Sequence, residues 1–139
     1  AHAAMAGLRA ARAWPDAPRP VPAHALLPER VLAGDVDARQ VLTDEVFAPL
    51  AHDRGPLLET VEAYLSTGCS IEGAARRLLV HPNTVRYRLR RAHDLTGWSA
   101  NDPRGQFVLR MALSLGRMSD VFPESPSGVV VELLQRRAD

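Results

Sequence analysis

The residues best placed to do chemistry in this sequence lie between Gly73 and His93. This stretch holds six arginines and no acid, whereas the rest of the chain carries more acid than base. All 17 basic residues are arginine, and the net charge of the whole chain is only +1. A local block of positive charge on a nearly neutral protein gives a directional field, which is typical of a surface that meets a polyanion. Charge alone leaves open a second interpretation, in which the arginines form a solvated helix face.

Two short helices joined by a turn must position these arginines. The first is expected to start after the N-cap residue Ser70, and the second at Pro82. Their inward faces carry apolar or small residues at helical spacing: Ile71, Ala74, Ala75 and Leu78 in the first helix, and Val85, Leu89 and Ala92 in the second. This is the geometry of a helix-turn-helix unit. Leu79 stands where many such turns have glycine, so either the turn has another geometry or Leu79 tolerates a strained backbone.

The outward positions of the second helix carry side chains that can bind DNA. Asn83 and Arg86 can bond base edges in a bidentate manner, and Thr84 can donate to a base or a phosphate. His81 lies at the helix start, where free backbone N–H groups favour phosphate. The other arginines expected to neutralise phosphates are Arg76, Arg77, Arg90 and Arg91.

Two residues of this helix have more than one interpretation. Tyr87 can stack in the core or bond a phosphate, because its ring is apolar and its tip is polar. Arg88 can contact a phosphate or pair internally with Glu59 or Glu62, since a half-buried arginine is usually paired. The sequence does not decide between these roles.

The surrounding sequence predicts further helices and no catalytic centre. A helix is expected from Pro56 to Gly68, another from Asp102–Pro103 onward, and a third from the N-cap Asp35 to Pro49, after a proline-rich extended segment. We therefore predict an all-α helical bundle that contains a helix-turn-helix and is preceded by a short helical linker. The expected divisions are residues 1–56 as an N-terminal helical remnant, 57–118 as the DNA-binding domain, and 119–139 as a tail that forms a short helix or a disordered end.

Other functional classes lack a matching pattern. The histidines show no zinc-ligand spacing, and the sequence contains neither a P-loop nor a dinucleotide-binding glycine motif, so we expect no catalytic residue, metal or cofactor. The single cysteine, Cys69, cannot form an internal disulfide. No apolar run approaches the roughly 20 residues that cross a bilayer. A cytoplasmic location is therefore expected.

A family resemblance follows from the segment that begins at Leu57, LLETVEAYLSTGCSIEGAARRLLVHPNTVRYRLRRAHDLTG. It resembles the C-terminal helix-turn-helix of the PucR family of bacterial transcription regulators, and the resemblance extends to about Met118. The residues that match the family's strongest motif are His81, Asn83, Thr84, Tyr87, Arg88 and Leu89. The resemblance implies an all-helical unit with its recognition helix at 82–94. It also implies an effector-sensing region upstream, which this chain lacks or retains only as a remnant.

These observations together predict a sequence-specific transcription regulator that places the recognition helix 82–94 in the major groove of double-stranded DNA. One such unit buries only about 600–1,000 Å² on DNA, so a homodimer on two half-sites is expected. The alternative is a helical protein-interaction module that binds an acidic partner.

Overall fold

The structure is a computed structural model that describes residues 7–121 of the chain. Within these residues every regular element is helical and no strand is present, which confirms the predicted all-α class. Residues 7–10 are helical, followed by short 3₁₀ turns at Ala11–Ala13 (η1) and Ala23–Leu26 (η2). The main helices are α2 (Leu27–Leu32), α3 (Val36–Val41), α4 (Ala48–His52), α5 (Leu57–Ser66), α6 (Ile71–Leu78), α7 (Pro82–Thr96) and α8 (Pro103–Val121). The predicted tail beyond residue 121 lies outside the described residues.

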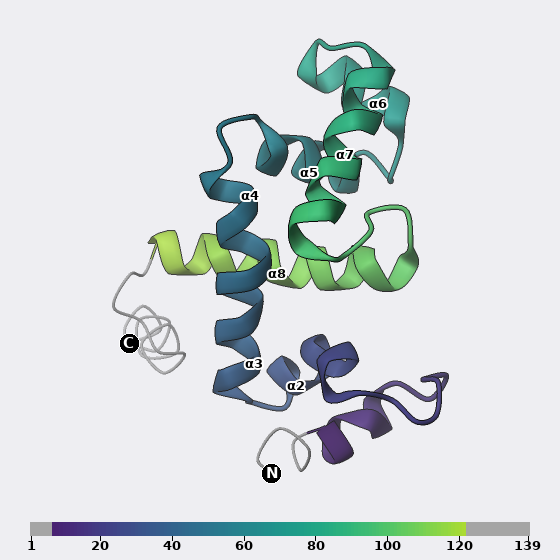
Figure 1. Cartoon of the computed structure of the whole chain (residues 1–139), viewed down its shortest axis with the longest axis vertical. Coiled ribbons are helices and arrows are strands. Elements are labelled where there is room, and N and C mark those ends of the chain that lie inside the picture. The colour runs from purple at the N-terminus through teal and green to yellow at the C-terminus, as the bar shows by residue number, and fades with distance from the viewer. Residues whose placement is uncertain (1–6, 122–139) are drawn as a thin grey trace, which may run out of the picture.

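The helices form two groups on either side of α8. In Figure 1, α8 crosses the middle of the molecule, α5, α6 and α7 lie above it, and α2 and the N-terminal turns lie below. The helix that contains α3 and α4 runs across α8 and reaches from the lower group to the upper one. Nothing in the part of the chain described here is a helix both long and apolar enough to span a membrane.

The helix predicted to end near Pro49 continues to His52. Helices α3 and α4 are joined without a break by a π-helical segment, Leu42–Phe47 (η3), and Pro49 lies in the first turn of α4. A proline inside an α-helix removes one N–H and crowds the carbonyl four residues earlier. A π-helical turn directly before the proline widens the hydrogen-bond pattern, so the helix passes through Pro49 without ending. Periodicity in the sequence gives no sign of this turn.

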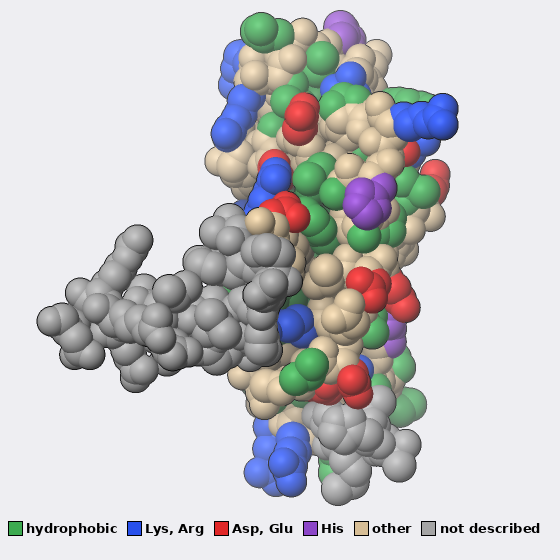
Figure 2. All heavy atoms as spheres, turned by 90° about the vertical axis from the view of Figure 1, so that its left-hand side faces the viewer, with side chains coloured by type: hydrophobic (Ala, Val, Ile, Leu, Met, Phe, Trp, Pro, Cys, Tyr) green, Lys and Arg blue, Asp and Glu red, His purple; other side chains and the backbone are tan. Residues whose placement is uncertain are grey.

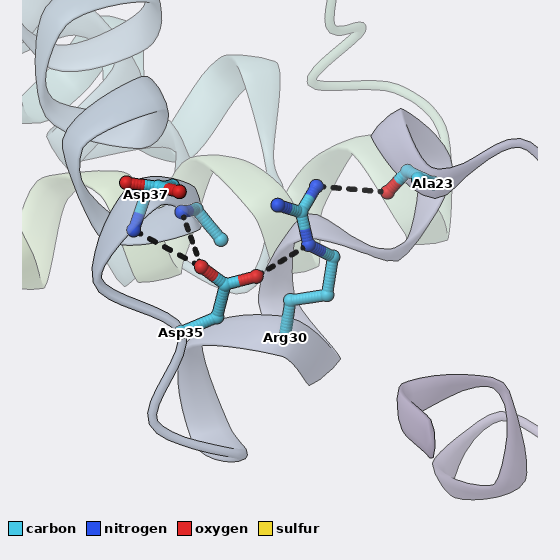
Figure 3. Close-up of polar contacts among 5 residues, drawn as sticks. Ala23, Arg30, Asp35 and Asp37 are labelled. Atoms are coloured by element: carbon cyan, nitrogen blue, oxygen red, sulfur yellow. Dashed lines mark hydrogen bonds and ion pairs between the residues drawn. The ribbon is translucent and has the colours of Figure 1, made fainter. Parts of the chain in front are cut away.

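Asp35 starts the long helix as predicted and also ties it to α2 (Figure 3). One carboxylate oxygen accepts from the N–H groups of Asp37 and Ala38, at 3.0 and 3.2 Å. The other accepts from Nε of Arg30 at 2.8 Å, and the side chains of Arg30 and Asp35 are only 7% and 4% exposed. Burial alone raises the pKa of Asp35. The bonds from Arg30, Ala38 and Asp37 outweigh that effect and hold the pKa below its ordinary value.

A single hydrophobic core joins the two groups of helices. Its buried residues come from both sides of α8 and include Leu27, Leu42, Phe47 and Leu50 from the N-terminal helices, and Val61, Val85, Leu89, Val108 and Ala112 from the rest. Gly116 allows close contact in this core, because a Cβ there would lie 2.2 Å from the ring of Phe47. Arg104 on α8 adds a polar link, since it pairs with Glu29 on α2 and lies 3.9 Å from the centre of the Trp14 ring. The helices that precede residue 57 therefore pack as part of the same body.

Candidate nucleic-acid interface

Helices α6 and α7 form the predicted helix-turn-helix. Ser70 caps α6 by accepting from the N–H of Gly73 at 2.9 Å, as expected. Among the predicted inward residues, Ala74, Ala75, Val85, Leu89 and Ala92 are buried, whereas Ile71 and Leu78 are half-buried against the core. Helix α7 runs from Pro82 to Thr96, two residues past the recognition-helix end that the family resemblance implies, and stops at Gly97, whose φ of 79° is left-handed. The close crossing of α6 and α7 follows from the small side chains on α6.

The turn between these helices keeps a left-handed residue even though that residue is leucine. Leu79 has φ 57° and ψ 43°, and its side chain is 91% exposed. Its N–H bonds to the carbonyl of Arg76, and the N–H of Val80 bonds to that of Ala75. These bonds close the end of α6 in the way that glycine usually permits. Of the two alternatives left by the sequence, the structure has the second, in which Leu79 tolerates a strained backbone.

The start of α7 differs from the expected phosphate site. Pro82 has no N–H, and Nδ1 of His81 accepts from the N–H of Asn83 at 3.0 Å. The N–H of Thr84 bonds to the carbonyl of His81 at 2.9 Å. The expectation of free backbone donors at this helix start is therefore wrong, because the His81 side chain caps the helix. The ring's other nitrogen, Nε2, is the atom of His81 left for a phosphate.

The outward face of α7 presents Asn83, Arg86, Tyr87, Arg90 and Arg91 to solvent, whereas Thr84 and Arg88 are half-buried. Arg86 donates to Oδ1 of Asn83 at 2.8 Å, so the two predicted base-reading side chains lie against each other. Tyr87 is 58% exposed, which excludes its alternative role in the core.

The alternative internal pairing of Arg88 is absent. Glu62 instead pairs with Arg117 at 2.6 Å, and no hydrogen bond or ion pair of Arg88 occurs among residues 7–121. On α6, Arg76 and Arg77 are both exposed, and Arg77 donates to Oγ of Ser66 at 2.6 Å. The predicted basic side chains of α6 thus lie beside the turn, with one of them bonded to the end of α5.

Two acids that the sequence places outside the arginine-rich stretch lie against α7 in space. Asp53, which follows α4, accepts from Arg91 at 2.8 Å, and its second oxygen accepts from the N–H of Gly55 at 2.8 Å. The bond from Arg91, with that from Gly55, lowers the pKa of Asp53. Glu72 lies 3.9 Å from Arg86 between exposed side chains, a separation typical of a weak surface contact. Figure 2 shows arginines at both edges of this upper end, with acidic and apolar side chains between them.

Among residues 7–121, no group of three or more His, Cys, Asp or Glu residues is placed to bind a metal ion. Cys69 lies in the α5–α6 turn, where it has φ 58° and a half-buried side chain. The exposed polar face of α7, rather than a pocket, is the candidate site.

Comparison with known families addresses the same segment. Residues 57–115 match the PucR C-terminal helix-turn-helix domain. Residues 57–115 therefore carry a PucR-type helix-turn-helix domain. A crystal structure of a regulator of polyketide synthase expression from Bifidobacterium adolescentis has a TM-score of 0.80 with this chain at 48% identity, and the match covers 85% of this chain and 50% of that one. The PucR resemblance and the helical fold expected from the sequence are thereby confirmed.

Two curated relatives extend the comparison. An uncharacterized protein of Mycobacterium tuberculosis is 51% identical over 120 residues, which are 86% of this chain and 29% of that protein. The purine catabolism regulatory protein of Bacillus subtilis is 47% identical over 62 residues, which are 45% of this chain and 12% of that protein. The chain therefore spans less than a third of the length of these relatives. The PucR-type domain points to DNA-binding transcription regulation and to a non-enzymatic role.

Proposed function

We propose that this chain is the DNA-binding part of a sequence-specific transcription regulator and that α7 enters the major groove of double-stranded DNA. The supporting observation is the division of α7 into two faces. Val85, Leu89 and Ala92 are buried, while the opposite side exposes donors and arginines. Packing accounts for the apolar face only. A helix that needed only to pack would not require this concentration of exposed hydrogen-bond donors.

Base reading would fall to the N-terminal half of α7. Asn83 and Arg86 are one helical turn apart and bonded to each other, so they would reach neighbouring base pairs as a unit. An arginine bonded to guanine and an asparagine bonded to adenine are the bidentate contacts that suit these side chains. Thr84, half-buried beside them, would touch a thymine methyl group or a phosphate.

Phosphate contacts would flank the base-reading side chains Asn83 and Arg86. His81, through Nε2, together with Tyr87 and Arg90 would hold phosphates along the groove, and the α6 arginines Arg76 and Arg77 would neutralise the backbone across the turn. Arg88 and Arg91 flank the same face and would contribute from its sides. Contacts of this kind fix the register of the helix but carry no sequence information themselves.

A homodimer on two half-sites fits this mode of binding. One helix-turn-helix unit buries only about 600–1,000 Å² on DNA, which limits the sequence it can select. Two units related by a twofold axis would read half-sites about one helical turn apart. The effector-sensing part of such a regulator would lie outside the DNA-binding unit.

A salt titration of duplex binding tests the proposal. Dissociation constants are measured for a random and a selected duplex between about 50 and 200 mM salt, where several phosphate contacts give a steep linear fall of log K with log salt. Arg86→Ala should weaken the selected duplex by about 1–3 kcal/mol and the random duplex much less. Arg90→Ala should weaken both alike. Arg117→Ala on α8 is the matched control, because it removes the same charge away from α7.

Three results would contradict the proposal: no duplex binding at the lowest salt, a slope near zero, or equal losses on both duplexes in Arg86→Ala. Binding of an acidic peptide without any duplex binding would favour the alternative interaction module, since an arginine-rich face can also dock acidic peptides.

A further inference from the structure

Asp53 is an acid from outside the helix-turn-helix domain that contacts the proposed recognition helix. It follows the last residue of α4, and its carboxylate accepts from Nη2 of Arg91 at 2.8 Å across 38 residues of sequence. The family match begins only at residue 57. The contact therefore joins the preceding segment to the face proposed to meet DNA.

The negative charge of Asp53 has no local explanation. An acid at the C-terminal end of a helix faces the negative end of the helix dipole, which is unfavourable. The side chain also closes the turn by accepting from the N–H of Gly55, but an asparagine or serine oxygen would do the same. Neither the helix end nor the turn needs a charge at this position. Arg91 is the one charged group shown in contact with Asp53 among the described residues.

The two partners differ in their access to solvent. The Asp53 side chain is 8% exposed, whereas the Arg91 side chain is 49% exposed. Arg91 thus reaches the surface of α7 with its charge already compensated by a carboxylate that water scarcely reaches. Departure of Arg91 toward a phosphate would remove the ion pair and leave the carboxylate with its bond from the N–H of Gly55. An approaching phosphate must therefore compete with Asp53 for the guanidinium.

We propose that Asp53 is an internal counter-charge that restrains the sequence-independent attraction of α7 to DNA phosphates by occupying Arg91. The inference rests on the proposed function and deepens it. With Arg91 occupied, one helix-turn-helix unit alone binds DNA weakly. Tight binding then requires both the base contacts and the simultaneous binding of two half-sites. If Asp53 instead orients Arg91 for phosphate, removing the charge of Asp53 should weaken duplex binding and make its salt dependence less steep.

The test compares Asp53→Asn with the wild-type chain on a random and a selected duplex over a salt series. This substitution removes the charge, but the amide oxygen can still accept from the N–H of Gly55. We expect the random duplex to bind on the order of fivefold more tightly at about 0.1 M salt, with a log–log slope steeper by about one, because one more arginine is free to release counterions. Adding Arg91→Ala to this variant should abolish the gain. Asp37→Asn, the matched control at the opposite end of the molecule, should change affinity less than about twofold.

Unchanged or weaker binding by Asp53→Asn, with the wild-type slope, would overturn the inference while leaving the proposed function intact. A wild-type chain that binds neither duplex would overturn both. Asp53→Ser provides a second variant, and circular dichroism checks that each one is folded. Loss of the folded state in both would also overturn the inference, because the carboxylate would then be required for the fold.

Discussion

Replacing Asp35 by alanine should destabilise the protein by roughly 4–6 kcal/mol, the sum of two losses. Loss of the N-cap bonds to Asp37 and Ala38 costs about 1 kcal/mol. Loss of the partner of Arg30, whose side chain is only 7% exposed, costs about 3–5 kcal/mol more because a buried charge is left without its acid. Asp35→Asn keeps an oxygen that can cap the helix but turns its amide NH₂ toward Nε of Arg30, so it should still cost about 3–5 kcal/mol.

Urea unfolding followed by circular dichroism at about pH 7 measures these differences, with the exposed Asp37→Asn as the control for charge. The pKa of Asp35 is lowered in the folded state. Its contribution is therefore present above the unfolded pKa of about 3.9 and is lost as the pH falls through the folded value. The stabilities of the wild type and Asp35→Asn should converge as the pH falls below about 3.9. An alanine variant within about 1 kcal/mol of the wild type at neutral pH would refute the reasoning.

Two further predictions concern the left-handed backbone of Leu79 and the close contact between Gly116 and Phe47. Leu79→Gly should leave the free energy of unfolding unchanged or raise it by up to about 1 kcal/mol. Relief of left-handed strain is worth about 1–2 kcal/mol, and the entropy cost of glycine is about 1 kcal/mol. A loss above about 1 kcal/mol in urea unfolding would show that Leu79 is not strained. Gly116→Ala should destabilise the protein by about 1–2 kcal/mol, because the added Cβ meets the Phe47 ring and the helix-propensity gain offsets only part of the overpacking. A smaller loss in a Phe47→Leu background, measured in a double-mutant cycle, would support that contact, and an identical loss would exclude it.

The helix-turn-helix could be predicted from sequence because its determinants are local. Each determinant acts within a few residues of its own position: the N-cap Ser70, the small residues Ala74 and Ala75, and the helix stop Gly97. Apolar spacing on α7 likewise fixes which side is buried, and so which side chains remain outside. Most of the side chains exposed on α7 could therefore be predicted individually.

Features that depend on distant segments could not be predicted in this way. Asp53 and Arg91 are separated by 38 residues, and no periodicity connects them. The stretch from Gly73 to His93 lacks acid along the sequence, yet the fold brings Asp53, which lies before α5, against Arg91. Local reasoning also missed the capping role of His81, because serine, threonine, aspartate and asparagine are the usual N-caps.

Amide chemical shifts, measured by nuclear magnetic resonance as a duplex is added, would show whether the outward face of α7 meets DNA. The largest shift changes should fall on His81, on residues 83–91 and on Arg76 and Arg77, and they should diminish as salt is raised. Shift changes confined to α2, α3 or α8, with those of α7 unaltered at low salt, would contradict the proposal that α7 meets DNA.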